Sequence, residues 1–241
     1  MSRLKVSMRE IGSVSVFDLV GEGTEESLKE VAEKIQRNIR RHRMQRIILN
    51  LQMLPDLEPI GLRRLMAVCI RPQRSLIYGV APKLMSFFED TYMPKNTRIC
   101  STEAEVADDF GPFLLEREKQ GDFPTNPNLL PEESMGYRIE KRRSKRMHVA
   151  LPISINVVLP QGGFLQTIAI ATNISEGGLF AEYLDLETAH KIESQEPLVG
   201  QKALIEISPS ANFTEQFRID GKIVRRSLDR KGVGIAVEFL S

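Results

Sequence analysis

The hydrophobic period of the chain changes at a proline-rich segment near its middle, which limits the folds that it can adopt. Residues 121–136 read GDFPTNPNLLPEESMG, a run of turn-forming residues without a sustained period. Helix-like and strand-like patterns alternate before this segment, whereas apolar residues recur at every second position after it. A chain of 241 residues can hold two hydrophobic cores. We therefore predict two domains, residues 1–120 and 137–241, joined by residues 121–136 as a linker.

The N-terminal part combines short β-rich runs with amphipathic helices. The helix expected from Thr24 to His42 has apolar residues at helical spacing, a threonine that can cap its start and arginines in its last turn. Two buried strands are expected in this half at residues 46–51 and 75–80. Three further helices are expected from about residue 61 onward, at residues 83–90 and at residues 103–119. Alternation of this kind predicts an α/β architecture in which helices cover a sheet.

The C-terminal part has the period of two that is typical of strands with one buried face. Apolar and polar residues alternate over residues 153–157 and again over residues 232–239. Similar runs at residues 203–207 and 217–224 are separated from their neighbours by glycine and proline turn signals. Several short strands at regular spacing predict a small antiparallel barrel or sandwich.

Composition and spacing argue against several classes of function. The net charge is +1, so no overall field attracts nucleic acid or an anionic membrane. The two cysteines, Cys69 and Cys100, have no paired spacing, the three histidines are far apart, and no apolar run approaches the roughly 20 residues that span a bilayer. We expect a cytoplasmic protein without membrane insertion and without a metal site.

The sequence contains no recognisable catalytic constellation. Cys69 follows the helical pattern of Leu62 and Leu65, so we expect it in the core. Asp108 and Asp109 are neighbouring carboxylates, but adjacent residues on a helix point to different faces. No phosphate-binding loop and no nucleophile elbow occur. We therefore predict a protein that is not an enzyme and has no catalytic residues and no cofactor.

A basic run precedes the first strand of the second domain. Residues 138–146 read RIEKRRSKR, with six formal positive charges and one negative charge. A solvated basic linker is one interpretation of such a run. A nucleic-acid-binding regulatory segment is another, although no aromatic residues are interleaved to stack on bases.

A second polar segment follows the strand expected at residues 164–172. Residues 173–180 read NISEGGLF and place an amide, a hydroxyl and two glycines within six positions. A plain hairpin turn uses the same residue types, so the segment alone does not indicate a binding site.

The basic run and the polar segment together resemble the signature of the PilZ family. That family has an R-x-x-x-R motif at the start of its domain and a [D/N]-x-S-x-x-G motif after the second strand. The residues that match the two motifs are Arg142, Arg146, Asn173, Ser175 and Gly178. The resemblance covers about residues 137–240 and implies a six-stranded antiparallel β-barrel that binds cyclic di-GMP.

The resemblance also implies a role for each motif residue. Arg142 and Arg146 would hold guanine and phosphate from a flexible arm, with Arg143 as an auxiliary, because the planar guanidinium matches the O6/N7 edge of guanine and phosphate oxygens. Asn173 and Ser175 would hold the ligand on the barrel.

The two glycines of the polar segment, Gly177 and Gly178, would let the backbone approach the ligand without a Cβ in the way.

The position of the basic run suggests a mechanism. Without ligand, like charges on a short arm repel, so we expect residues 138–147 to be extended and mobile. The ligand's negative charges would fix this arm against residues 173–178. We expect that ordering the arm alters the placement of the two domains and the interaction with a partner.

The N-terminal half resembles a STAS domain, the fold of anti-sigma-factor antagonists, over about residues 4–118. The resemblance rests on an early β-hairpin, the helix after Thr24, the strand at residues 46–51 and the segment at residues 54–65. Signalling members carry D-S-S-G in that segment, whereas residues 58–61 here read EPIG. The resemblance implies a domain that binds a protein partner, and the missing serines imply that phosphorylation there does not control it.

Overall fold

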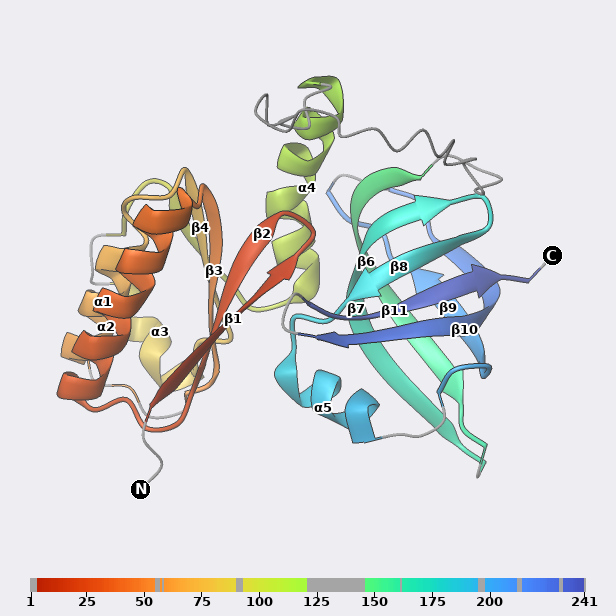
Figure 1. Cartoon of the computed structure of the whole chain (residues 1–241), viewed down its shortest axis with the longest axis horizontal. Coiled ribbons are helices and arrows are strands. Elements are labelled where there is room, and N and C mark those ends of the chain that lie inside the picture. The colour runs from red at the N-terminus through yellow and green to blue at the C-terminus, as the bar shows by residue number, and fades with distance from the viewer. Residues whose placement is uncertain are drawn as a thin grey trace, which may run out of the picture.

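Two domains lie side by side in the computed structural model (Figure 1). The structure describes residues 4–54, 57, 59–89, 93–120, 146–160, 162–194, 198–211, 214–229 and 232–240. Residues 121–145, which include the predicted linker and most of the basic arm, lie outside these ranges.

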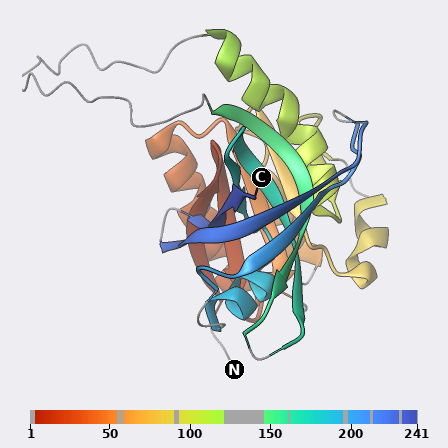
Figure 2. The same cartoon turned by 90° about the vertical axis from the view of Figure 1, so that its right-hand side faces the viewer.

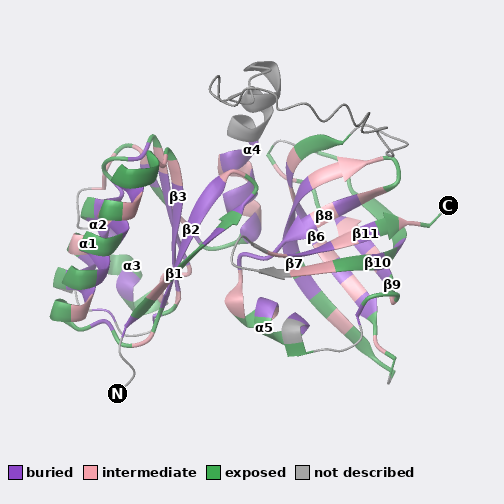
Figure 3. Ribbon diagram, in the orientation of Figure 1, coloured by how far each residue is buried: buried purple, intermediate pink, exposed green. Residues whose placement is uncertain are grey.

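The N-terminal domain is built on a five-stranded sheet with the order β1-β2-β3-β4-β5. Strands β1 and β2 form an antiparallel hairpin, and β2 to β5 run parallel. The strands are β1 Lys5–Ile11, β2 Val14–Val20, β3 Arg46–Met53, β4 Arg74–Tyr78 and β5 Thr97–Cys100. Residues 47–51 of the central strand β3 are all buried because both faces of this sheet are covered (Figure 3).

Three helices cover one face of the sheet (Figure 1): α1 Glu25–His42, α2 Pro59–Val68 and α3 Pro82–Glu89. The Thr24 hydroxyl caps α1 by accepting a hydrogen bond from the Ser27 backbone N–H at 3.4 Å, as the sequence predicts. Helix α2 begins at Pro59, two residues before the expected start, because proline suits the first helical position. Cys69 is fully buried in this core, and burial raises the pKa of its thiol to about 12.

The opposite face of the sheet packs against helix α4, Glu103–Gln120, and against the second domain. The two neighbouring carboxylates of α4 point to different domains. Asp109 accepts a hydrogen bond from Arg74 Nε of the sheet at 2.7 Å, while Asp108 accepts one from the Ala211 backbone N–H of the second domain at 3.0 Å. Helix α4 therefore belongs to the interface between the domains.

The C-terminal domain is a closed barrel with the strand order β10-β11-β8-β7-β6-β9 (Figures 1 and 2). Its antiparallel strands are β6 Met147–Val158, β7 Phe164–Ser175, β8 Gly178–Glu182, β9 Lys202–Ile207, β10 Phe217–Asp229 and β11 Gly232–Phe239. The prediction of a six-stranded antiparallel barrel is confirmed. Helix α5, Leu186–Ser194, was not predicted, although the Asp185 carboxylate caps it by accepting from the backbone N–H groups of Glu187 and Thr188.

A buried polar network joins the two domains. Arg9 on β1 donates from Nε and Nη2 to the Asp18 carboxylate at 2.7 and 3.1 Å, and both side chains are more than nine-tenths buried. The same guanidinium donates to the backbone carbonyls of Tyr183 and, at 2.7 Å, Leu184, directly after β8. Asn50 donates to Asp18 at 2.9 Å and to the Leu184 carbonyl at 3.2 Å. The sheet thus binds the chain that leaves β8.

The end of β8 makes a second link between the domains. The buried Glu182 carboxylate accepts hydrogen bonds from the Gly12 backbone N–H at 3.0 Å and from the Thr172 hydroxyl at 2.6 Å. Burial raises the pKa of Glu182 above its ordinary value. Strand β8 is therefore attached to the hairpin of the N-terminal domain at its C-terminal end.

A buried carboxyl group at this interface gives a testable pH dependence. Glu103 accepts a hydrogen bond from the Tyr78 hydroxyl at 2.8 Å, and burial, with a smaller contribution from Asp185, raises the pKa of Glu103 above 4.5. The folded state then binds more protons than the unfolded state above pH 4.5, so ionisation of Glu103 lowers stability as pH rises through its folded pKa. We expect Glu103→Gln, which keeps an acceptor for Tyr78, to be more stable than wild type at pH 8, with the difference shrinking toward pH 4.5.

Urea unfolding of wild type and Glu103→Gln between pH 4.5 and pH 8 measures the difference in their free energies of unfolding. The variant Glu26→Gln, at an exposed position on α1, is the control for the loss of one negative charge. A stability difference between Glu103→Gln and wild type that does not change with pH would contradict the prediction.

Candidate functional site

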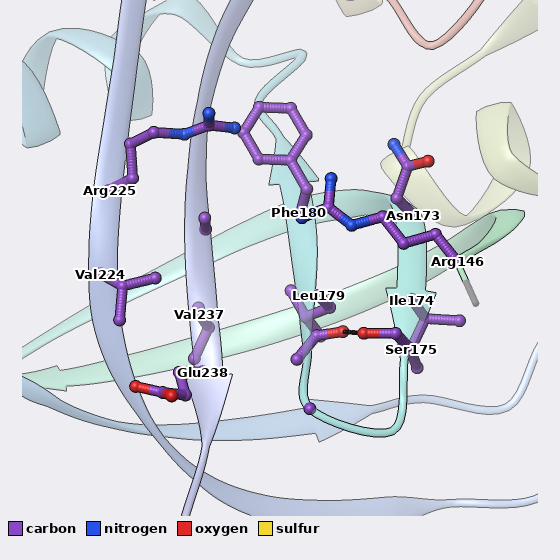
Figure 4. Close-up of a pocket in the computed structure, with 13 residues that line it drawn as sticks. Arg146, Asn173, Ile174, Ser175, Leu179, Phe180, Val224, Arg225, Val237 and Glu238 are labelled. Carbon is purple, nitrogen blue, oxygen red and sulfur yellow. Dashed lines mark hydrogen bonds between the residues drawn. The ribbon is translucent and has the colours of Figure 1, made fainter. Parts of the chain in front are cut away.

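A pocket of about 390 Å³ lies on the outer surface of the barrel, between the turn that joins β7 to β8 and the strands β10 and β11 (Figure 4). Its volume falls in the range of about 300–1,000 Å³ that is usual for small-molecule sites. The residues that line it are Arg146, Asn173, Ile174, Ser175, Gly177, Gly178, Leu179, Phe180, Val224, Arg225, Ala236, Val237 and Glu238. Five of the seven site residues predicted from the sequence are among them.

The turn between β7 and β8 presents two polar side chains to this pocket. Asn173 and Ser175 are two positions apart on β7 and so lie on the same face of the strand. Ser175 pairs with Gly178 across the turn, and its hydroxyl donates to the Gly178 carbonyl at 3.2 Å. The Asn173 amide donates to the neighbouring Thr172 hydroxyl at 3.4 Å, a long contact that leaves most of its hydrogen-bonding capacity for a ligand.

The two glycines of the turn have different surroundings. A Cβ on Gly178 would lie 2.2 Å from the Val237 carbonyl oxygen, so glycine at this position allows β11 to approach β8. A Cβ on Gly177 would meet no atom within 4 Å. The structure therefore gives Gly178 a packing role that the sequence did not reveal, while the space beside Gly177 is open.

Arg146 reaches the pocket because of how β6 pairs with β7. Met147 lies opposite Ile174, and His148 lies opposite Asn173, which places the residue before β6 beside the polar turn. In Figure 4 the Arg146 side chain extends beside Asn173 and Phe180. The predicted site residues Arg142 and Arg143 fall outside the described part of the chain.

Comparison with known proteins identifies the domain that carries this pocket. Residues 140–241 match the sequence model of the PilZ domain family. This part of the chain is a PilZ domain. A search of curated proteins gave no match to the chain.

Solved structures similar to the chain include PilZ proteins. The Bacillus subtilis inhibitor of motility MotI/DgrA is 18% identical with a TM-score of 0.32, and the match covers 43% of this chain and 44% of that chain. The chain thus spans less than half of that protein's length. The PilZ domain of YcgR from Escherichia coli, solved with c-di-GMP, is 17% identical with a TM-score of 0.28, and the match covers 42% of this chain and 79% of that domain.

A further similar structure is the Bacillus cell fate determinant SpoIIAA in its phosphorylated form. It is 15% identical to this chain with a TM-score of 0.35, and the match covers 42% of this chain and 96% of that protein.

Three charged or aromatic residues of the PilZ pocket were not predicted from the sequence. Phe180 ends the NISEGGLF segment, and alternation along β8 places it on the same outer face as Gly178. Glu238 is exposed on β11, and the period of two could have identified it. Arg225 could not have been found in this way, because β10 contains an irregularity between Ile223 and Arg225.

The chemistry of the pocket suits a ligand that carries both anionic groups and planar bases. Arg146 and Arg225 can pair with phosphate oxygens or with the acceptor edge of guanine. The Glu238 carboxylate can accept hydrogen bonds from ring N–H and amino groups. Within the described residues, no group of three or more His, Cys, Asp or Glu side chains could hold a metal ion. None of the helices in those ranges combines the length and apolar character needed to cross a membrane.

Proposed function

We propose that this chain is a cyclic di-GMP receptor that acts as a cytoplasmic signalling adaptor and not as an enzyme. The single observation that carries the proposal is the convergence of Arg146, Asn173 and Ser175 on one pocket of a PilZ domain. Cyclic di-GMP has two guanines and two negatively charged phosphodiesters, which match guanidinium, amide and hydroxyl groups in this arrangement. The solved PilZ domain of YcgR with c-di-GMP supports the same ligand class.

The arm before β6 completes the site in this proposal. Arg142, Arg143 and Arg146 hold the ligand from the arm, while Asn173 and Ser175 hold it from the turn. Ligand binding therefore orders the arm against the barrel.

Strand β8 offers a route from the pocket to the N-terminal domain. Gly178 at its start lines the pocket, and Glu182 at its end accepts a hydrogen bond from Gly12 of the N-terminal hairpin. We propose that ligand binding acts through the arm and this strand on the placement of the STAS-like domain, and thereby on its protein partner. A ligand that moves an equilibrium between two placements from 1:99 to 99:1 must bind the favoured one about 10⁴-fold more tightly.

Calorimetric titration of the full chain tests the proposed ligand. We expect cyclic di-GMP to bind saturably, and duplex and single-stranded nucleic acids to bind weakly or not at all. Absence of cyclic di-GMP binding, together with nucleic-acid binding that weakens steeply with salt, would replace the proposal with the nucleic-acid alternative for residues 138–146.

The proposed mechanism predicts protection of the arm. Saturating cyclic di-GMP should slow amide exchange and proteolysis at residues 138–147, because the arginines contact the ligand only when the arm is folded onto the barrel. Fluorescent labels at the exposed positions Arg37 and Gln216 should report a changed interdomain distance by energy transfer. If the ligand saturates the protein and neither the protection nor the distance changes, the arm mechanism is wrong.

A further inference from the structure

A row of side chains crosses the outer face of the barrel at the pocket. Strand pairing places Asn173 opposite Phe180, Phe180 opposite Ala236, and Ala236 opposite Arg225, so that β7, β8, β11 and β10 each contribute one residue. All four residues line the same pocket. The polar surface at Asn173 therefore extends across the neighbouring strands to an aromatic side chain, Phe180, and a cationic side chain, Arg225.

A β-bulge brings Arg225 to this surface. Ile223 is buried inside the barrel and Val224 is 44% exposed, so regular alternation would turn Arg225 inward. The register between β10 and β11 shifts between Ile223 and Arg225, and both Val224 and Arg225 line the pocket. A bulge re-aims a side chain in this way, and bulges are frequent next to functional sites.

Phe180 packs against small residues of the neighbouring strand β11. Ala236 separates Phe180 from Arg225, and the Arg225 guanidinium carbon lies 5.5 Å from the centre of the Phe180 ring. A Cβ on Gly234 would lie only 3.0 Å from the Phe180 Cζ atom, so the ring extends over this glycine. Figure 4 shows the ring of Phe180 between the side chains of Arg225 and Arg146.

We propose that Phe180 and Arg225 bind one guanine of the ligand, with the base stacked on the Phe180 ring and Arg225 donating to its O6/N7 edge. This inference rests on the proposed function and adds two recognition residues to the motif residues. An aromatic ring stacks on any base, whereas a guanidinium fork is specific for the acceptor edge of guanine. The pair therefore contributes affinity through Phe180 and base specificity through Arg225.

The test uses the full chain and two variants, one of which replaces the aromatic ring with an aliphatic side chain while the other replaces the guanidinium with an amide. We expect Phe180→Leu and Arg225→Gln each to weaken cyclic di-GMP binding by about tenfold in calorimetry. The matched control is Arg218→Gln, on the same strand β10, where the side chain is 69% exposed, pairs with Glu206 at 2.8 Å and does not line the pocket. Circular dichroism and thermal unfolding verify that each variant is folded.

A second measurement detects the stack directly. In the wild-type complex at saturation, we expect nuclear Overhauser contacts between the Phe180 ring protons and guanine H8. If wild type binds cyclic di-GMP but either variant retains wild-type affinity, or if these contacts are absent, the inference is overturned while the proposed function stands. If wild type does not bind cyclic di-GMP at all, the proposed function fails and the inference fails with it.

Discussion

Replacing Arg9 with alanine is expected to lower the free energy of unfolding by about 3–5 kcal/mol, because it leaves a buried carboxylate without its cationic partner. The Arg9 side chain is 6% exposed and the Asp18 side chain 2%, so the native structure leaves little room for water to replace the lost hydrogen bonds. The same substitution removes the donors to the carbonyls of Tyr183 and Leu184, which belong to the other domain. The loss should therefore affect both the N-terminal core and its attachment to the barrel.

Urea unfolding followed by circular dichroism measures this effect on the full chain. Arg64→Ala is the matched control, since Arg64 also pairs with a carboxylate, Glu25 at 2.9 Å, but both side chains are more than a third exposed. An exposed pair of this kind contributes about 0–1 kcal/mol. Equal destabilisation by Arg9→Ala and Arg64→Ala would show that the interdomain network does not have the strength that its burial implies.

The second large effect is expected on ligand affinity. Arg142→Ala and Arg146→Ala should each weaken cyclic di-GMP binding by roughly tenfold to over a hundredfold, because a charge-assisted hydrogen bond contributes about 1.5–3 kcal/mol. Arginine to lysine at either position should also weaken binding, since a point charge cannot make the bidentate contact of a guanidinium. Calorimetry on the full chain measures each dissociation constant.

Arg41→Ala is the control for these variants, because Arg41 is an exposed arginine at the end of α1 in the other domain. It removes the same charge without touching the pocket, so its affinity should equal that of wild type. Wild-type affinity in both Arg142→Ala and Arg146→Ala would show that the arm does not bind the ligand. That result would leave Asn173, Ser175 and the barrel surface as the remaining site.

Local sequence patterns predicted most elements of this protein. Helix α1 follows from the spacing of Leu28, Val31 and Ile35, and its start from Thr24, because helical periodicity and capping involve only residues a few positions apart. The short strands β5 and β8 and helix α5 were not predicted, since none of them has a long enough apolar pattern to stand out from its neighbours.

The candidate site was predictable in part for the same reason. Asn173 and Ser175 lie on one face of β7 because they are two positions apart on the strand, independently of how the other strands pair. Their spacing in the motif indicates that they act together. Phe180 and Arg225 come together only through the pairing of β8 and β10 with β11. No spacing in the sequence relates two residues on strands that far apart.

The sequence by itself therefore determined the α/β and all-β character of the two domains, the positions of most helices and strands, and the two motifs of the PilZ domain. Only the tertiary structure decided the order in which the barrel strands pair, the bulge that turns Arg225 outward, and the burial of Arg9 against the carbonyls after β8. The physical reason is the range of the interactions. Periodicity, capping and turn chemistry act within a few residues, whereas strand register and domain packing depend on contacts between residues far apart in the chain, such as Arg9 and Leu184.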